Sequence, residues 1–580
     1  MGRYHRIRTV VFLTILLTSI PFFPLGSTCK DIIATTQATG AEYSLLLKVR
    51  DPSRPGLQVL TRVPRGTTYT YHHPWSGRPW DFSVAHTFFG VATLGDTLPN
   101  IVKAGMTLSD AGLAFADADT ASHWVNPTKN AWDDFDWIRY ACQTSDDEAQ
   151  AIALLTADAI EKMHATSVAE NLFLVSPLRS TVIEADAFHD TITDVNGVWV
   201  MSNYPISLWR TEVLHSLPIA AAFDTQKDAW VRQGTTIRLG SVCGVKILTI
   251  NENTITVKAV PTAVFQLYGQ EDPVMITLGK RGSVGPYSVV YESVQGHRAE
   301  VSVQTAAHAW EQELLDRIEP AIGHITVQDM ISWSRLHGGD LDGLRPLCED
   351  AYPYEAATVF KVPVDHSDVL SGGWFSANHA CSSIFVPFHI CDDTIYGPYQ
   401  TGYAAQVSLD LLKKYGHATL IPSCQAVEEV FLAETNLSET IAHVLVHSNI
   451  NITSFMTSMD TAMAQQAYLT EQIWLSMPNT TFDSLRTMWK NNYSTTLDQL
   501  ETIGENLGTT SDASQGVAQI ESLALSICHT RMTEAIVAGV PSLEQQQEYD
   551  AVVHRFSVGK IESGFELLQH VFHSTHVPSC

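Results

Sequence analysis

One stretch near the N-terminus decides the fold of this chain: Cys29-Lys-Asp-Ile-Ile-Ala-Thr-Thr-Gln-Ala-Thr-Gly-Ala-Glu-Tyr-Ser-Leu-Leu-Leu-Lys-Val-Arg-Asp51. Its apolar and β-branched residues form two runs, 31–35 and 43–49, and a Thr-Gly pair at 39–40 lies between them. Such runs on either side of a glycine-containing turn predict two β-strands. The stretch begins with a cysteine, and its neighbours on both sides determine what that cysteine can do.

Residues 1–28 have the organisation of a secretory signal peptide. Basic residues come first, the apolar run 9–17 follows, and the small residues 26–28 precede Cys29. The apolar run is too short to span a bilayer, which takes about 20 residues. Cleavage after Thr28 would make Cys29 the first residue, with a thiol and a free α-amino group side by side. We therefore expect an exported protein that is secreted or extracytoplasmic, with a lysosome-like or cell-surface compartment as alternatives.

Three roles are open to Cys29 on its local sequence. A disulfide is common in exported proteins, and the chain has nine cysteines, so the other eight could pair if Cys29 stayed free. Lipidation requires a Leu-small-small-Cys pattern, whereas Leu25 stands one place too early. The third role is that of an N-terminal nucleophile. The sequence leaves the disulfide connectivity open.

Composition limits the partners of the chain. The formal charge is −27 at pH 7, and a protein this acidic is repelled by nucleic acids and anionic lipid surfaces. No apolar run after residue 28 is long enough to span a membrane, so we expect no transmembrane segment after signal removal. The sequence contains no Gly-x-Ser-x-Gly elbow and no dinucleotide fingerprint, and we expect no metal or organic cofactor. The oligomeric state stays open.

The pattern of the remaining chain predicts further elements. Residues 132–165 have helical spacing, and 144–146 can cap a second helix within this segment. Residues 171–184 and 197–203 are apolar runs of the β type. The glycine-rich segment 279–285 lacks the spacing of a phosphate-binding loop and predicts a hairpin turn.

These patterns divide the chain into five segments. Short β-branched runs separated by Gly, Asn and Pro predict a β-rich insertion over 230–305. The core lies on both sides of it, in 29–229 and 306–404. The signal peptide 1–28 precedes the core, and a mainly helical region 405–580 follows it, where Gly and Pro are few until the end.

Several landmarks stand in a shared order: Cys29, Lys48-Val-Arg-Asp51, 109–114, 135–141, 173–175, 182–184, 200–203, 325–330 and 381–388. In this order they resemble the C69 dipeptidases and the related secernins, from Cys29 to about residue 400, interrupted by the insertion. That family belongs to the N-terminal-nucleophile (Ntn) hydrolases. The resemblance therefore implies an α+β fold, a four-layer αββα sandwich with two stacked antiparallel sheets between helical layers.

The resemblance also implies a catalytic constellation. Cys29 would be the nucleophile, Lys48 holds the family's Lys/Arg position and Asp51 its Asp. A cysteine pKa lies near 8.5, so the thiol needs a base, and an α-amino group with a pKa of about 7.7–8.0 can serve. Positive charge from Lys48 or Arg50 would favour the thiolate, and Asp51 could orient the amine. Without the family pattern, Lys48 and Arg50 would be interpreted as a solvated strand end.

Asn203 is the candidate donor to the oxyanion that forms during attack on an amide. The alternative for Asn203 is a turn residue before Pro205, a role that Asn suits equally well. Two positions depart from the family pattern. Val49 replaces an Asn, and Asp117 falls where relatives tend to carry an Asn, although a carboxylate would repel an oxyanion. Both departures bear on the substrate and on activity itself.

Histidines offer weaker signals. His443 and His447 lie four apart on a predicted helix, which is the spacing of a metal pair, but no Glu-x-x-His completion is present. Surface or core positions are therefore the favoured interpretation for both. His337 could reach the substrate pocket or stand at a helix end.

Three functions remain. The first is an exported cysteine-type hydrolase of the C69 dipeptidase kind, which cleaves small peptides through a thioester on Cys29. The second keeps the fold but acts on N-acyl amides, as an acylase or acyltransferase of the bile-salt or penicillin type. The third is a non-catalytic, secernin-like binding protein. The expected partner is a small peptide or N-acyl amide substrate.

Overall fold

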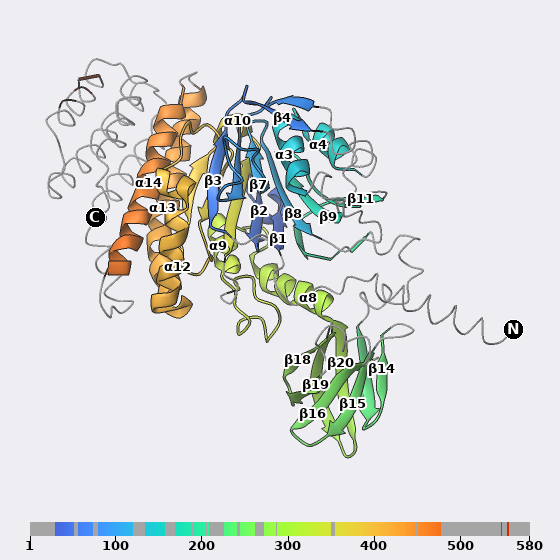
Figure 1. Cartoon of the computed structure of the whole chain (residues 1–580). Coiled ribbons are helices and arrows are strands. Elements are labelled where there is room, and N and C mark those ends of the chain that lie inside the picture. The colour runs from blue at the N-terminus through green and yellow to red at the C-terminus, as the bar shows by residue number, and fades with distance from the viewer. Residues whose placement is uncertain are drawn as a thin grey trace.

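The computed structural model describes most of the chain between Cys29 and residue 476. The described ranges are 29–51, 56–72, 79–119, 134–156, 169–186, 189–204, 206–207, 226–239, 244–260, 272–285, 287–349, 354–447 and 451–476, with the isolated residues 547, 551, 554 and 555. The predicted signal peptide and nearly all of the predicted helical region after residue 476 lie outside these ranges. The described structure is a mixed α/β fold with several antiparallel sheets (Figure 1).

A six-stranded antiparallel sheet carries the N-terminal stretch. Its order is β12-β1-β2-β21-β22-β23. The strands are β1 (Lys30–Ala34), β2 (Tyr43–Arg50), β12 (Val198–Ser202), β21 (Ala356–Pro363), β22 (Gly372–Ser376) and β23 (Val386–His389). The two strands predicted at 31–35 and 43–49 are thus confirmed within one residue at each end. Nearly all their side chains are buried, which explains the continuous apolar runs.

The connection between β1 and β2 is more than a turn. A short helix, α2 (Thr36–Thr39), precedes Gly40, which has a left-handed φ of 64°. A side chain at Gly40 would place its Cβ only 2.0 Å from the carbonyl oxygen of Gly323. Glycine is therefore required by both the backbone conformation and the close approach of the neighbouring loop.

A second, seven-stranded antiparallel sheet has the order β11-β10-β9-β8-β7-β6-β3. Its strands are β3 (Gln58–Val63), β6 (Phe88–Thr93), β7 (Ala104–Ser109), β8 (Leu113–Asp119), β9 (Ala169–Val175), β10 (Ser180–Asp186) and β11 (Asp190–Asp194), while β4 (Thr68–His72) pairs separately with β5 (Pro79–Ser83). The strands predicted over 171–184 and 197–203 correspond to β9, β10 and β12.

The two large sheets contact each other through one shared core. Phe89 of β6 stacks on Phe388 of β23 with ring centroids 5.2 Å apart, and Phe360 of β21 meets the same ring edge-on. Buried residues of β1, β2, β8 and β9 belong to this same hydrophobic cluster. Burial of apolar side chains from both sheets therefore holds the strand that follows Cys29 in place.

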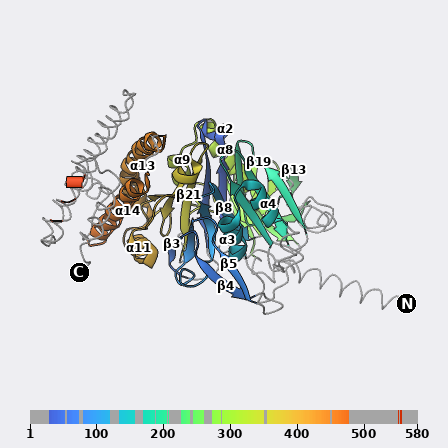
Figure 2. The same cartoon turned by 90° about the horizontal axis from the view of Figure 1, so that it is seen from above.

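Helices cover the outer sides of the sheets. Figure 2 shows α3 and α4 on one side and α13 and α14 on the other. α3 packs on β7 and β8, α9 on β2 and β21, and α14 on β23. The bounds are α3 (Asp134–Thr144), α4 (Glu148–Leu155), α8 (Ala306–Ile318), η3 (Glu319–Ala321), α9 (Val327–Ser334), α10 (Ser367–Leu370), α11 (Gly397–Thr401), α12 (Tyr403–Tyr415), α13 (His417–His447) and α14 (Thr453–Ser476). None of the described helices combines the length and the hydropathy needed to cross a membrane.

The predicted cap of the second helix needs a correction. The N-cap of α4 is Asp147, whose side chain accepts a hydrogen bond from the backbone N–H of Gln150 at 2.9 Å, so the cap lies just after the predicted 144–146. Asp146 instead contacts the ring of His86 at 2.9 Å. The part of the predicted helical segment after residue 156 lies outside the described ranges.

The residues of the predicted β-rich insertion form two four-stranded sheets with a hydrophobic core of their own. The first has the order β13-β20-β19-β18 and the second β14-β15-β16-β17. The strands are β13 (Lys227–Arg232), β14 (Thr236–Arg238), β15 (Gly244–Ile250), β16 (Thr254–Val260), β17 (Val274–Thr277), β18 (Arg281–Val284), β19 (Tyr287–Gln295) and β20 (Arg298–Thr305). Figure 1 shows this unit apart from the large sheets, joined to them by α8.

The predicted hairpin turn falls at the end of the segment 279–285: Val284 of β18 pairs with Tyr287 of β19, so the turn between these strands includes Gly285. The first part of the segment has another role. β17 pairs with β16 and β18 pairs with β19, so the intervening residues carry the chain from one sheet to the other. Gly279 and Lys280 still form a tight turn, in which the N–H of Lys280 donates to the carbonyl of Thr277. The glycine pattern correctly indicated a turn, but local sequence does not say which strand each neighbour pairs with.

Candidate functional site

Cys29 lies at the start of β1, opposite the end of β2. The register pairs Asp31 with Lys48 and Lys30 with Val49. Since successive side chains of a strand point to opposite faces, the side chains of Cys29, Asp31 and Lys48 share one face of the sheet. That face looks toward the seven-stranded sheet, because Arg50, two residues after Lys48, donates to the carbonyl of Val91 in β6 at 3.2 Å.

Lys48 is the centre of the charges around Cys29. Its Nζ lies 3.3 Å from Oδ2 of Asp31 and 3.6 Å from Oδ1 of Asp117 in β8. Its positive charge also lowers the pKa of the Cys29 thiol. The Lys48 side chain has no solvent exposure, so these interactions are not weakened by water. The solvated strand end considered for Lys48 from its local sequence therefore does not describe its position.

The site holds more negative than positive groups. Burial raises the pKa of the Cys29 thiol to about 12; Lys48 lowers this pKa, whereas Asp117, Asp31 and Asp119 raise it. Burial likewise raises the pKa of Asp31 to about 8, against the lowering effect of Lys48. In the uncleaved chain the thiol is consequently protonated at neutral pH, and attack on an amide requires a base close to the sulfur.

The side chains of Lys30 and Asp51 lie on the other face of the sheet. The Nζ of Lys30 is 2.7 Å from Oδ2 of Asp51 and 3.8 Å from Glu349, and both Lys30 and Asp51 side chains are fully buried. Glu355 stands opposite Asp51 at the start of β21, and burial together with the charge of Asp51 raises the pKa of Glu355. The structure thus brings Asp51 together with Lys30 and Glu355, and not with the thiol of Cys29.

Arg50 is held by other partners than Cys29. Its guanidinium donates to Oε1 of Gln58 at 2.7 Å and lies 4.8 Å from the ring centroid of Phe135 in α3. The side chain is nearly fully buried. Arg50 therefore joins the two sheets, whereas Lys48 is the predicted cation that lowers the pKa of the cysteine.

Asn203 follows β12, the strand that pairs with β1 on its other edge. The hydroxyl of Ser202 donates to the carbonyl of Cys29 at 2.6 Å, which fixes this edge beside the cysteine. The side-chain amide of Asn203 donates to the carbonyl of Asp119 at 2.7 Å. Since an amide NH₂ has two hydrogens, one donor of Asn203 is engaged and the second remains for another acceptor.

Sequence reasoning missed three groups near Cys29. Asp31 stands two residues after Cys29, and strand alternation alone would have placed it on the same face. Asp119 and Arg345 come from β8 and from the loop after α9, and both have electrostatic interactions with Cys29. No local signal could have found these two, because they are brought in by the tertiary fold.

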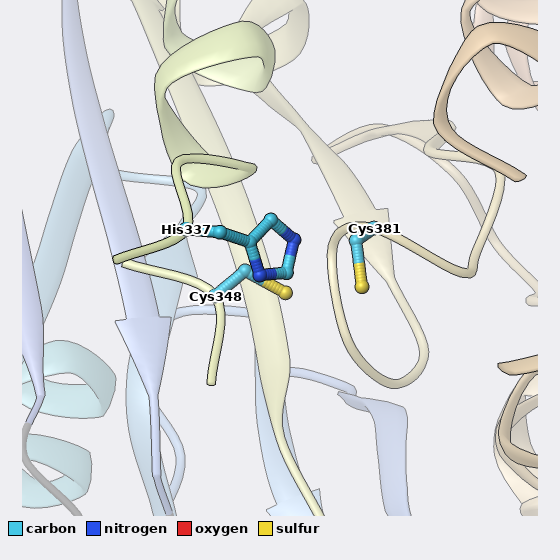
Figure 3. Close-up of side chains that lie close together, drawn as sticks. All are labelled: His337, Cys348 and Cys381. Carbon is cyan, nitrogen blue, oxygen red and sulfur yellow. The ribbon is translucent and has the colours of Figure 1, made fainter. Parts of the chain in front are cut away.

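Several groups of side chains have the composition of metal ligands. Figure 3 shows His337, Cys348 and Cys381, whose ligand atoms lie within 4.8 Å of one another. Two thiols and an imidazole suit Zn²⁺, although the same thiols could join in a disulfide under oxidising conditions. His337 thus lies beside two cysteines, just after the end of α9, as the helix-end alternative predicted. A second group, formed by Asp117, Asp119 and Glu170, is an acidic cluster beside the site.

Comparisons with known proteins identify no family for this chain. No protein-family model and no curated protein matches it. A penicillin V acylase structure from Agrobacterium tumefaciens is 11% identical over 29% of this chain and 49% of that chain, with a TM-score of 0.21. A mutant conjugated bile acid hydrolase from Clostridium perfringens is 12% identical over 37% and 62%, with a TM-score of 0.23. The chain covers less than two thirds of either structure, and likeness at these TM-scores supports no inference about fold or activity.

Proposed function

We propose that this protein is an exported cysteine-type Ntn amidohydrolase that cleaves small peptides in the manner of the C69 dipeptidases. One observation carries the proposal: Cys29, at the junction with a signal-like segment, shares a sheet face with the fully buried Lys48, which stands at the family's Lys/Arg position and lowers the pKa of the thiol. The two contacting sheets with helices on their outer sides are compatible with the αββα sandwich that this proposal includes.

The chemistry begins with removal of residues 1–28. The new α-amino group of Cys29 takes the proton of its own thiol, and the sulfur attacks the carbonyl carbon of the substrate amide. Lys48 stabilises the thiolate, and the remaining N–H of Asn203 donates to the oxyanion. The C–N bond then breaks, the leaving amine takes the proton from the α-amino group, and a thioester on Cys29 remains.

The second half of the reaction uses water. The α-amino group of Cys29 removes a proton from the water, which attacks the thioester carbonyl. The C–S bond breaks, the carboxylic acid is released, and the sulfur regains the proton. In these steps the base is the α-amino group of Cys29 itself, which becomes free only after cleavage. The raised pKa of the Cys29 thiol in the uncleaved chain therefore does not argue against the mechanism.

The proposal is tested with Cys29→Ala and a matched control, Cys391→Ala. Both cysteines are partly exposed in the structure, so the two variants remove comparable side chains. Each purified protein is assayed with a panel of dipeptides and N-acyl amino acids. We expect Cys29→Ala to lose at least about 10³-fold in kcat/KM on dipeptides and Cys391→Ala to retain it. Full activity of Cys29→Ala would overturn the mechanism.

The same assay separates the acyl specificities. Faster turnover of N-acyl amino acids than of dipeptides would move the assignment to an acylase that uses the same nucleophile. The non-catalytic alternative also has a specific observation in its favour, namely that Asp117 raises the pKa of Cys29 where relatives tend to carry a neutral Asn. Absence of any Cys29-dependent turnover would favour that alternative.

A further inference from the structure

Three histidines meet at the place where α10 contacts α13. His366 immediately precedes α10, and His443 and His447 lie one helical turn apart near the end of α13. Residues four apart lie on the same side of a helix, so both imidazoles of α13 reach the same neighbour. The sequence spacing alone offered only a pair. The fold adds a third ligand from a position 77 residues before His443, as the numbering in the sequence shows.

The rings are close together. The centroid of His366 lies 5.2 Å from that of His443 and 4.8 Å from that of His447, and the latter two centroids are 4.4 Å apart. One nitrogen from each ring lies within 4.8 Å of the others. With Zn–N bonds of about 2.0–2.1 Å, tetrahedral nitrogen ligands stand about 3.3 Å apart. Small side-chain rotations would therefore close the three rings around one ion.

The tautomer of His447 is fixed in a way that suits a ligand. Its Nδ1 lies 2.9 Å from the backbone carbonyl oxygen of His443, which can only accept, so Nδ1 carries the proton. Nε2 of the neutral ring is then a free acceptor. A histidine that binds a metal through one nitrogen commonly donates the N–H of its other nitrogen to a backbone carbonyl, as His447 does here.

The cluster lies at the surface of the described structure. His447 is exposed and the other two are partly exposed, so an ion can reach the cluster from solvent.

We propose that His366, His443 and His447 form a binding site for a divalent transition-metal ion, with Zn²⁺ as the best fit. Three imidazoles and an open fourth position for water are a recurrent ligand set for zinc. Binding would tie α10, which follows strand β21 of the six-stranded sheet, to the C-terminal end of α13. The proposal is independent of the hydrolase activity proposed for Cys29, because the cluster uses none of its residues.

The site is tested on the full chain with His366→Ala, His447→Gln and a control, His297→Ala, from the exposed turn between β19 and β20. Zn²⁺ is titrated calorimetrically into each chelator-treated protein, and the melting temperature is measured with and without it. We expect about one Zn²⁺ per chain at this site, a higher melting temperature with Zn²⁺, and at least about 10-fold weaker binding in both cluster variants. The control should bind like the unmodified protein.

Co²⁺ substitution separates this cluster from the one formed by His337, Cys348 and Cys381. Cobalt held by three imidazoles absorbs in the visible without a thiolate-to-cobalt charge-transfer band, whereas a two-cysteine site shows that band. The proposal predicts a visible Co²⁺ spectrum that His447→Gln abolishes. It is overturned if no metal binds, or if both cluster variants bind Zn²⁺ and Co²⁺ as tightly as the unmodified protein.

Discussion

Two buried cations, Arg335 and Lys48, differ in how completely their acidic partners are hydrogen-bonded. Arg335, after α9, donates from both Nη atoms to the two oxygens of Glu428 in α13, at 2.7 and 2.6 Å, and its Nε donates to the carbonyl of Ala380. Around Lys48, one ammonium lies near both Asp31 and Asp117, and its charge also lowers the pKa of the Cys29 thiol. Oδ1 of Asp31 and Oδ1 of Asp117 have no hydrogen-bond partner among the described residues.

This difference separates a structural ion pair from a candidate reactive centre. A buried pair that is fully hydrogen-bonded holds two segments together and leaves nothing to react. A centre with surplus negative charge and a shared cation perturbs the pKa of its members, which is typical of functional sites. The following variants test whether the two sites behave as differently as their geometry indicates.

The largest effect is expected at Arg335. Arg335→Met leaves the Glu428 carboxylate buried without its cation, which costs about 3–5 kcal/mol and should lower the melting temperature strongly. The double variant Arg335→Met/Glu428→Leu removes both charges and should recover much of the loss. Thermal unfolding followed by circular dichroism measures both. Equal destabilisation by the single and double variants would show that the pair is not the source of the effect.

Lys48→Met should affect reactivity more than stability. Because the pKa of Asp31 is already raised to about 8, its carboxyl can take up a proton when the lysine is removed, so the melting temperature falls less than in Arg335→Met. Loss of the cation raises the pKa of Cys29, and we expect at least about 10-fold slower alkylation by iodoacetamide at pH 8. Lys413→Met, at an exposed position on α12, is the control. If Lys48→Met leaves the alkylation rate of Cys29 unchanged, Lys48 does not act on the thiol.

Asp117→Asn should act in the opposite direction. Replacing the carboxylate removes a charge that raises the pKa of Cys29, so the thiolate fraction at a fixed pH increases. We expect alkylation of Cys29 to become about 3- to 10-fold faster, which corresponds to a fall of about 0.5–1 pKa unit. Asp194→Asn, on the partly exposed edge strand β11, serves as the control. Slower alkylation in Asp117→Asn would contradict the assigned charge effect.

The smallest effect concerns pH and Glu471 of α14, near the Arg335 pair. Burial raises the pKa of Glu471 to about 8, although the N–H of Ile384 donates to its carboxyl at 2.7 Å. The unfolded chain releases this proton near pH 4.5, so the stabilisation is complete below that pH and is lost as pH rises toward 8. Between pH 5 and 8, the melting temperature of Glu471→Gln should fall by about 2–4 °C less than that of the unmodified protein. The exposed Glu429→Gln should behave like the unmodified protein.

The sequence predicted the local elements around Cys29 better than the connections between them. Strands β1 and β2 followed from buried apolar runs, and Lys48 was singled out only through the resemblance to the C69 dipeptidases. The neighbours Asp119 and Arg345 could not be predicted, because they reach the site from a different sheet and from a distant loop. The hairpin turn predicted within 279–285 forms at Gly285, between β18 and β19. The change of sheet between β17 and β18 could not be predicted, since pairing depends on the sheet that each strand joins.

The histidine cluster also depends on the tertiary fold. The spacing of His443 and His447 was visible in the sequence, yet a pair alone gave no reason to prefer a metal site. His366 completes the cluster from the residue before α10, with a left-handed φ of 55°. Tertiary structure therefore converts a weak motif into a testable site.

The most direct test of the central claim is the identity of the first residue and of the reacting atom in the active protein. The full chain is expressed in cells with an export pathway, and the active protein is purified and mixed with a substrate that it cleaves. The mixture is quenched in acid and digested, and the N-terminal peptide is sequenced by mass spectrometry. The account predicts that this peptide begins at Cys29 and carries the acyl group on its sulfur, removable by hydroxylamine. An active protein that retains residues before Cys29, or that carries the acyl group on another residue, would contradict it.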